Sequence, residues 1–207
     1  MPIKSSGELG IGELRTYFGL SGQTALSAFY KDGDPIPISP LNASVPTSGQ
    51  ISMSNMYNSY RLAYGPSLEI DPGESSSTQA WIGYQESGAL ISDGQIGSIT
   101  TTFGTNPYTD GNGNSRRANA LLYEKATSRL YFKTATSSTT NNDAGVYRIY
   151  VLGFLFPFGA LYTSSAAATG MQGTPGSAQY GRYWRWDSIA NPFQIGYPTN
   201  LDVEYLQ

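Results

Sequence analysis

The stretch Leu121–Phe132, LLYEKATSRLYF, decides the fold of this chain. Two apolar and aromatic runs flank a short polar segment, and in the second run Leu130 and Phe132 alternate with Tyr131 and the following lysine. Alternation with a period of two is typical of a half-buried β-strand, and a short polar segment between two such runs is typical of a hairpin. The stretch therefore predicts an antiparallel hairpin whose turn lies around Ala126–Ser128.

The remainder of the chain after Leu62 repeats this pattern. Runs rich in aromatic and β-branched residues are separated by segments rich in Gly, Ser, Thr and Asn. The absence of a long amphipathic helix pattern favours packed sheets over alternating strands and helices. We therefore expect a mainly β fold with an antiparallel β-sandwich or jelly-roll-like domain over residues 62–207. The expected strands are Gln79–Gln85, Gln95–Phe103, Ala118–Glu124, Ser128–Ala135, Gly145–Leu152, Tyr180–Trp186 and Leu201–Leu206.

The longest uncharged apolar stretch is Ile149–Tyr162, IYVLGFLFPFGALY. It is shorter than the roughly 20 apolar residues of a membrane-spanning helix, and Gly153, Pro157 and Gly159 interrupt it. We interpret it as a buried strand, a break marked by the proline and a second buried strand, and expect no membrane partner. An apolar interface inside an oligomer is the first alternative, and a membrane-active tip is the second.

The composition excludes several kinds of chemistry. The chain has 207 residues with 12 Lys+Arg, 15 Asp+Glu, no Cys and no His, so disulfides, thiolate sites and imidazole catalysis are excluded. A net charge of −3 and a single adjacent basic pair, Arg116–Arg117, argue against nucleic-acid binding. Only 13% of the residues are charged, as in surfaces that become buried between subunits. The start, MPIKSSGELG, lacks the apolar region of an export signal.

Acidic residues suggest no catalytic or metal site. Asp110–Asn114, DGNGN, resembles the opening of a calcium loop, but Leu121 stands where the closing glutamate belongs, so an ordinary turn is the preferred interpretation. A polysaccharide-degrading enzyme would need two facing carboxylates, and no recognisable motif supplies them. We expect no enzyme activity, cofactor or metal. The grouped carboxylates, expected in turns or at the chain end, are Asp32/Asp34, Glu69/Asp71/Glu74 and Asp202/Glu204.

The segment Tyr180–Asp187, YGRYWRWD, is the strongest local feature. As a strand it places Arg182, Trp184 and Trp186 on one face and Tyr183, with the residues that alternate with it, on the other. Trp, Tyr and Arg are enriched at binding hot spots, and flat aromatic faces also stack on sugar rings. Three interpretations stay open: a protein interface, a platform for a host surface glycan, or core packing of one face.

The first sixty residues contain three related units. They read LGIGELR (Leu9–Arg15), TALSAFY (Thr24–Tyr30) and ISMSNMY (Ile51–Tyr57). The third and sixth positions are apolar and the fourth is Gly or Ser, which we expect to be the N-cap of a short helical turn. Units this short must pack on one another or on a partner. The candidate assembly contacts are Ile11, Leu14, Leu26, Phe29, Ile51, Met53, Met56 and Tyr57.

A proline-rich segment, residues 31–50, connects the second and third units. Pro35, Pro37, Pro40 and Pro46 exclude a helix there and favour extended backbone. It is therefore expected to be a strap that lies along a surface. Together with the repeats it forms a predicted N-terminal attachment segment over residues 1–61.

The repeats resemble the beginning of many tailed-phage virion proteins described as tail-fibre or structural. Those proteins have a run like ISLSDIR-x-EFG, then ISLSDYYRGG, then a Pro-rich strap that ends IPTSG-x-ISLSNFY. The counterparts here are GIGELRTYFG (Gly10–Gly19), TALSAFYKDG (Thr24–Gly33) and VPTSGQISMSNMY (Val45–Tyr57). The chain departs from the pattern at Gly10 and Gly12 in the first unit and at Lys31-Asp32 in the second. The resemblance covers about residues 8–60.

The resemblance implies a virion structural protein assembled in the bacterial host cytoplasm, with the N-terminal segment docked on neighbouring subunits. It implies a tail, baseplate or fibre component, with other virion proteins as partners and a trimer or ring of copies. It implies no catalytic residue. A receptor-binding or glycan-binding adhesin, with Tyr183, Trp184 and Trp186 as the stacking platform, is the alternative, and a capsid decoration or head-fibre protein is a further one.

Overall fold

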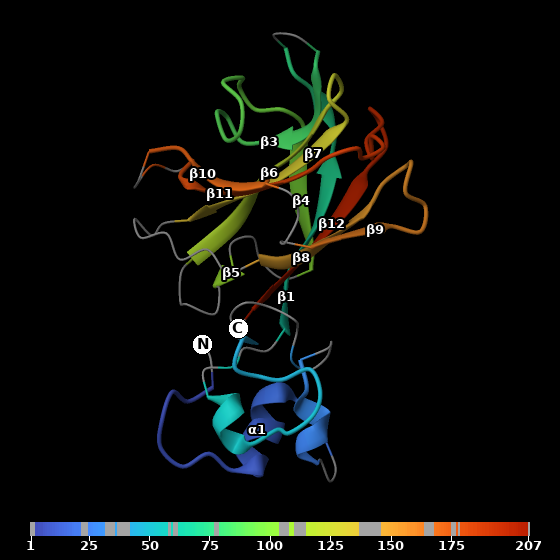
Figure 1. Ribbon diagram of the computed structural model, residues 1–207. Helices are drawn as coiled ribbons and strands as arrows, with labels where there is room; N and C mark the ends of the chain where they lie inside the picture. Colours follow the sequence, from blue (N-terminus) through green and yellow to red (C-terminus); the bar gives the residue numbers. More distant parts are fainter. Residues whose placement is uncertain are drawn as a thin grey trace.

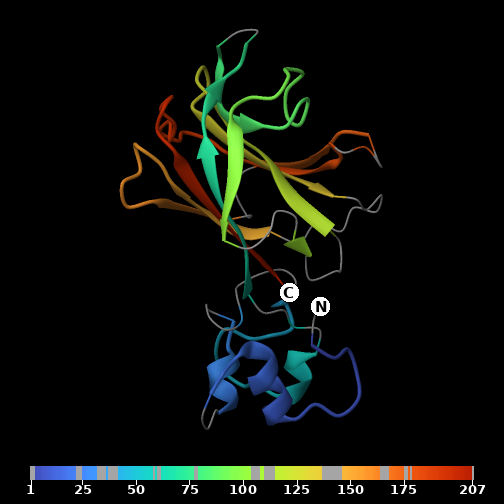
Figure 2. The same ribbon diagram turned by 180° about the vertical axis from the view of Figure 1, so that it is seen from behind.

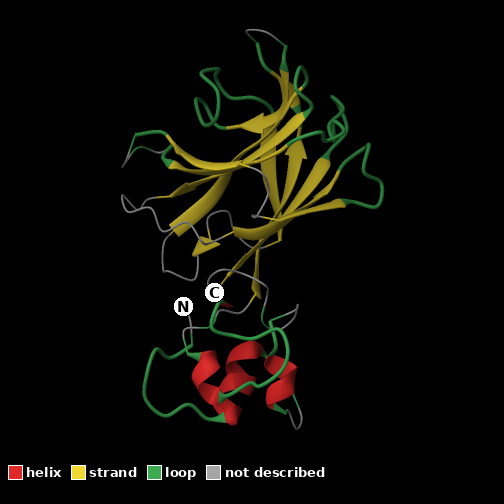
Figure 3. Ribbon diagram, viewed as in Figure 1, coloured by secondary structure: helices red, strands yellow, loops and turns green. Residues whose placement is uncertain are grey.

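The computed structural model describes residues 3–21, 25–31, 36, 42–57, 59, 62–76, 79–103, 108–109, 115–136, 146–163, 168–174, 177 and 179–206. A small helical module and a larger β-sandwich make up the molecule (Figure 1). The helices lie in the module and the strands in the sandwich (Figure 3). The module contains α1 (Ile11–Phe18) and the 3-10 helices η1 (Leu26–Phe29) and η3 (Met53–Met56).

Two antiparallel sheets form the sandwich. The first has the order β4 (Ser98–Phe103), β1 (Leu62–Asp71), β12 (Thr199–Leu206), β8 (Val146–Leu152) and β9 (Ala160–Thr163). The second has the order β10 (Ala168–Gln172), β11 (Gly181–Trp186), β7 (Arg129–Thr136), β6 (Ser115–Glu124), β3 (Trp81–Gln85) and β2 (Gly73–Glu74), and β5 (Tyr108–Thr109) also pairs with β6. The predicted mainly β fold, an antiparallel sandwich preceded by short helical turns, is confirmed.

The hairpin predicted for Leu121–Phe132 is β6–β7. Its strands pair from Arg116↔Thr136 to Glu124↔Arg129, and Ser128 in the turn has a positive φ of 54°. A bulge between Ala118 and Ala120 interrupts the register. The hairpin is therefore confirmed, and it forms the centre of the second sheet.

The sandwich core lies between the two sheets. Leucine, isoleucine and valine side chains come mainly from the first sheet, whereas the second supplies most of the aromatic rings. Burial of this apolar surface stabilises the fold by roughly 25 cal/mol for each Å² removed from water. The largest fully buried residues of this core are Leu68, Ile70, Leu121, Leu130, Phe132 and Ile149.

All seven strands expected from the sequence are present, and β1 is the principal one that was missed. Gly65 and Pro66 interrupt its apolar pattern, and proline cannot donate a ladder hydrogen bond. The structure accommodates them at an irregularity between Tyr64 and Ser67 in the pairing with β12. β1 runs from the helical module into the sandwich, as the views from both sides show (Figure 2).

The apolar stretch Ile149–Tyr162 contains a strand, a turn at Pro157 and a second strand, as predicted. The expectation that the second strand is buried is wrong. β9 is an edge strand, and its Leu161 is exposed while Tyr162 faces the core. The reason is that β9 has a partner on one side only and its outward side chains meet no second layer.

Each of the three repeat units contains the start of a helix, an eight-residue α-helix in the first and a four-residue 3-10 helix in the second and third. In each, the third position begins a helix (Ile11, Leu26, Met53), so the N-cap is the second position (Gly10, Ala25 and Ser52). The predicted N-cap at the fourth position is therefore wrong by two residues. In the first and third units the cause is a side chain at the fifth position, which reaches back to the N-cap amide. Glu13 accepts from Gly10 N at 2.9 Å, and Asn55 accepts from Ser52 N at 2.8 Å.

The sixth position of each unit forms the core of the module. Leu14, Phe29 and Met56 are all fully buried in one cluster, to which the strap region adds Ile36 and Val45. Strap residues therefore enter the module core, instead of only lying along its surface. Pro35, Pro37 and Pro40 lie outside the described residues. The module cluster extends from Ile3 to Met56, whereas the sandwich clusters begin at Leu68, so the two cores share no residue.

Several carboxylates expected in turns lie in strands instead. Glu69 and Asp71 belong to β1, and Asp202 and Glu204 belong to β12. Asp202 accepts a hydrogen bond from Ser67, and Glu204 pairs with an arginine of β8, so cross-strand partners compensate these charges. Glu74 lies in β2, and Asp32 and Asp34 are outside the described residues.

Candidate functional site

The two tryptophans of β11 point into the sandwich. Trp184 is 3% exposed and stacks on Phe132 with ring centroids 5.6 Å apart. Trp186 is 8% exposed, contacts the ring of Tyr162 and donates its indole N–H to the carbonyl oxygen of Thr163 at 3.2 Å. The proposed platform of Trp184 and Trp186 is therefore wrong, because the face that carries them is the core face. Arg182, on the same face near the strand end, is half-buried.

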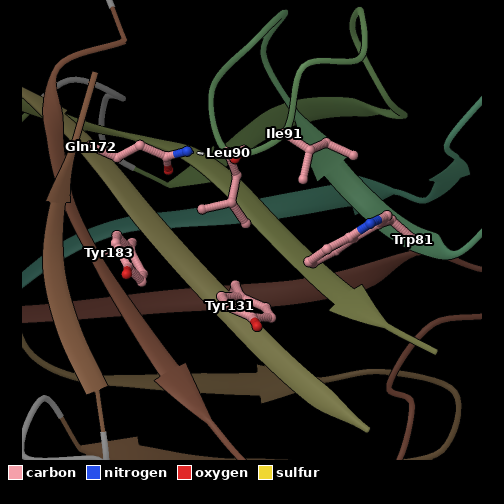
Figure 4. Close-up of a pocket in the computed structure, with 6 residues that line it drawn as sticks. All are labelled: Trp81, Leu90, Ile91, Tyr131, Gln172 and Tyr183. Carbon is pink, nitrogen blue, oxygen red and sulfur yellow. Dashed lines mark hydrogen bonds between the residues drawn. The ribbon is translucent and has the colours of Figure 1, made fainter. Parts of the chain in front are cut away.

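The opposite face of this sheet carries a pocket. Three aromatic side chains from three strands line it: Trp81 of β3, Tyr131 of β7 and Tyr183 of β11. Leu90 and Ile91 cover it from the loop at residues 86–97, here called the roof loop (Figure 4). The pocket has a volume of about 350 Å³, and Gln172 of β10 is its sixth lining residue.

The aromatic rings are held at defined positions. The centroids of Trp81 and Tyr131 are 5.3 Å apart, and their planes are inclined by 55°. Tyr183 pairs with Gly170 across the β10–β11 ladder. A Cβ atom at Gly170 would lie 2.9 Å from the Tyr183 ring, so the glycine leaves the space that the ring occupies.

One buried side chain organises the roof loop. Gln85 Nε2 donates toward the carbonyl oxygens of Ile91, Asp93 and Gly94 at 3.0–3.3 Å. Its Oε1 accepts from the backbone N–H groups of Leu90 and Ile91, each at 3.1 Å. At the base of the loop, Arg117 pairs with Glu86, which raises the pKa of the guanidinium. The roof of the pocket is therefore fixed through its backbone.

A buried lysine fastens two loops beside the pocket. Lys133 is fully buried on β7, and its ammonium group donates to the carbonyl oxygens of Ala89 in the roof loop and Gln179 before β11. Removal of the ammonium from water lowers its pKa to about 8, an effect that Glu86 partly opposes. Lys133 thus joins the roof loop to the segment that leads into β11.

Polar atoms of the pocket have unequal partners. Gln172 Nε2 donates to the carbonyl oxygen of Leu90. Its Oε1 is buried and accepts no hydrogen bond from the described residues. In the close-up this oxygen points toward the tyrosine side of the pocket (Figure 4). Desolvation and the nearby Glu124 carboxylate raise the pKa of the Tyr131 phenol, whose hydroxyl donates to Glu124 at 3.2 Å.

A second surface feature is the turn between β8 and β9 with the neighbouring segment 195–197, here called the apolar tip. Phe158 is 91% exposed, and the Phe154 ring lies 4.9 Å from that of Tyr197. The Tyr150 hydroxyl holds the turn by donating to the carbonyl oxygen of Phe158. Exposed apolar groups that gather in this way are typical of contact surfaces. The exposed members are Phe154, Leu155, Phe158, Leu161, Ile195 and Tyr197.

The candidate assembly residues of the module separate into three groups by exposure. Leu14, Phe29 and Met56 are internal, so they support the module instead of contacting a partner. Ile11 is 39% exposed at the start of α1. The remaining members are half-buried: Leu26, Ile51, Met53 and Tyr57, whose hydroxyl donates to the carbonyl oxygen of Gly7.

The pocket residues Trp81, Tyr131 and Leu90 were not selected from the sequence. Trp81 lies in a predicted strand and Tyr131 alternates with core residues, but their proximity depends on the order of strands in the sheet. The described residues hold no group of three or more potential metal-ligating side chains, and Asp110–Asn114 lie outside that part of the chain. None of the described helices has the length and hydrophobicity needed to cross a membrane. No protein-family model, curated protein or solved structure matches the chain.

Proposed function

We propose that the chain is a non-enzymatic structural protein of a tailed-phage particle, in its tail, baseplate or fibre. The observation that supports this most is the N-terminal module. Its three units, which resemble the start of phage structural proteins, each place a short helix around one core. A module with its own core can dock on a neighbouring subunit while the sandwich makes or projects further contacts.

The exposed apolar side chains of the two parts support a role in assembly. Ile11 is the exposed apolar residue of α1, and Phe158 is the most exposed large apolar residue of the apolar tip. Burial of both against neighbouring subunits would remove apolar surface from water and stabilise the particle. The partners in this proposal are other virion proteins and further copies of the chain, arranged as a trimer or ring.

Particle incorporation tests the proposal. The phage genome that encodes the chain is altered to carry Ile11→Asp in the module or Phe158→Asp in the apolar tip, so that the two contact surfaces can be compared. We expect mass spectrometry of purified particles to detect the wild-type chain, and Ile11→Asp to reduce its amount more than Phe158→Asp does. Antibody labelling in electron microscopy then shows whether the chain lies in the tail, the baseplate, a fibre or the head.

Two results would contradict the proposal. Purified particles that lack the wild-type chain would exclude a structural role. Normal incorporation of Ile11→Asp together with loss of Phe158→Asp would exclude docking through the module and assign the contact to the apolar tip. Circular dichroism of both variants ensures that the comparison concerns folded protein.

A further inference from the structure

Three aromatic side chains line one pocket outside the core between the two sheets, where they pack against a smaller buried apolar cluster. Trp81, Tyr131 and Tyr183 come from separate strands, and each is only half-buried. Leu90 and Ile91 of the roof loop cover the space between them but leave about 350 Å³ (Figure 4). That volume is near the lower end of the roughly 300–1,000 Å³ typical of small-ligand sites.

The inclined aromatic walls suit a saturated ring. The rings of Trp81 and Tyr131 contact each other with their planes inclined by 55°, so they form one angled wall and not a parallel slot for a flat aromatic ligand. Aromatic faces are negative, and the C–H groups on one side of a pyranose ring carry partial positive charge. A pyranose can therefore pack its C–H side on an open aromatic face of this wall.

The pocket also has an acceptor available for a ligand hydroxyl. The Gln172 amide is oriented by the bond from its Nε2 to the Leu90 carbonyl oxygen, so Oε1 is held on the pocket side. This oxygen is buried and accepts no hydrogen bond within the described part of the chain. A buried acceptor without a donor destabilises the fold, and a hydroxyl donor from a ligand would remove this cost. A ligand that is purely hydrocarbon would leave this cost in place.

Charges near the pocket favour a neutral ligand. Glu124 accepts from the Tyr131 hydroxyl at the pocket edge, and Arg129, which pairs with Glu124 across the hairpin, is engaged by Asp187 at 2.7 Å. Positive and negative groups thus compensate one another, and none of the six lining residues carries a charge. An acidic sugar would find no cation in the pocket itself.

We propose that this pocket binds a neutral pyranose residue of a glycan, with the ring against the aromatic wall formed by Trp81, Tyr131 and Tyr183 and a hydroxyl donated to Gln172 Oε1. Lys133 and Gln85 are positioning residues, because they hold the roof loop without lining the pocket. The inference is independent of virion assembly: the pocket is remote in the chain from the module, and its test uses purified protein.

Glycan retention by the purified full chain tests the inference. The protein is applied to an array of neutral and acidic oligosaccharides, and the retained sugars are titrated while the indole N–H signal of Trp81 is followed by NMR. We expect retention of neutral pyranosides and a shift of the Trp81 signal. Trp81→Ala and Tyr183→Ala should each weaken binding about tenfold or more, as for other stacked rings.

Matched variants separate ring contact from folding. Tyr197→Ala removes an exposed aromatic side chain of the apolar tip and should leave glycan binding unchanged. Trp81→Phe keeps an aromatic face and should retain more binding than Trp81→Ala. Gln172→Leu should weaken neutral sugars without unfolding the chain, because it removes the unpaired acceptor.

Three results would overturn the inference. The first is that the array retains no neutral sugar, and the second is that binding persists unchanged in Trp81→Ala. The third is that N-acetyl-tyrosinamide, but no sugar, shifts the indole N–H signal of Trp81. The last result would assign the pocket to an aromatic side chain of a protein partner. None of them bears on whether the chain is incorporated into particles.

Discussion

Replacement of one buried amide should release the roof of the pocket. Gln85 is fully buried, yet it makes its hydrogen bonds to the backbone of a loop at the surface. The change Gln85→Glu preserves size and the accepting oxygen but removes the Nε2 donor. The new oxygen then faces the carbonyl oxygens of Ile91, Asp93 and Gly94 without a hydrogen atom between them.

The expected cost follows from the bonds that are lost. One amide has two N–H groups, so its approaches to three carbonyl oxygens count as two good hydrogen bonds. Their loss costs about 1 kcal/mol each, and the new carboxylate oxygen, which is buried without a donor, adds about 1 kcal/mol or more. The free energy of unfolding should therefore fall by about 3 kcal/mol or more, unless the roof loop opens to solvent and limits the loss.

Two measurements distinguish loop opening from global destabilisation. Urea denaturation gives the free energy of unfolding, and hydrogen exchange reports the Leu90 and Ile91 amides that donate to Gln85. The matched control is Gln95→Glu, an equal change in an exposed residue of the same loop. We expect faster exchange at both amides in Gln85→Glu and normal exchange in Gln95→Glu.

The pH dependence gives an independent check. Burial raises the folded-state pKa of the introduced carboxyl group above its unfolded value, so the protonated form stabilises the fold at low pH. The difference between variant and wild type should shrink as pH falls and grow as pH rises through that pKa. Equal stability and equal exchange in Gln85→Glu and Gln95→Glu at neutral pH would refute the role assigned to Gln85.

Three further changes probe other parts of the structure. Burial lowers the pKa of Lys133 from 10.5 to about 8, so the unfolded chain binds more protons than the folded chain between these pH values. The free energy of unfolding of the wild type, measured by urea denaturation, should therefore rise with pH across this window. Lys133→Met should show no such rise. Gly181→Ala should lower the free energy of unfolding, measured by thermal denaturation, by about 1–3 kcal/mol, because its Cβ would collide with the Thr134 carbonyl oxygen. Gly12→Ala has open space around its Cβ and should stabilise α1. Leu14→Ala should lower the free energy of unfolding of the module by about 2–5 kcal/mol and leave hydrogen exchange of the sandwich unchanged.

Strand positions could be predicted because alternation is a local property. The hairpin around Ala126–Ser128 needed no knowledge of the remainder of the chain, and the same applies to the seven predicted strands. β1 was missed because Gly65 and Pro66 break its pattern, and only the pairing with β12 reveals how the irregularity is absorbed. The N-caps were misplaced because the decisive contacts come from Glu13 and Asn55, further along each unit.

The pocket could not be predicted, for a different reason. Alternation correctly separated Trp184 and Trp186 from Tyr183, but both faces of β11 carry aromatic residues, so the pattern does not tell which face is internal. Burial resolves this, since the tryptophans lie in the core and Tyr183 lies in the pocket wall. Trp81 joins Tyr183 only through the order β11, β7, β6, β3, which is a non-local property.

The hydrogen bonds of Gln85 affect how the sequence of the roof loop can vary during evolution. Every bond it makes ends on a backbone atom, so the loop keeps its path whatever side chains project from it. Exposed positions such as Ser87 and Ser92 are therefore open to diversification at little cost in stability. A randomised library at these positions on an unaltered Gln85 background should yield mostly folded proteins, and the same chain then becomes a scaffold on which new recognition can be selected.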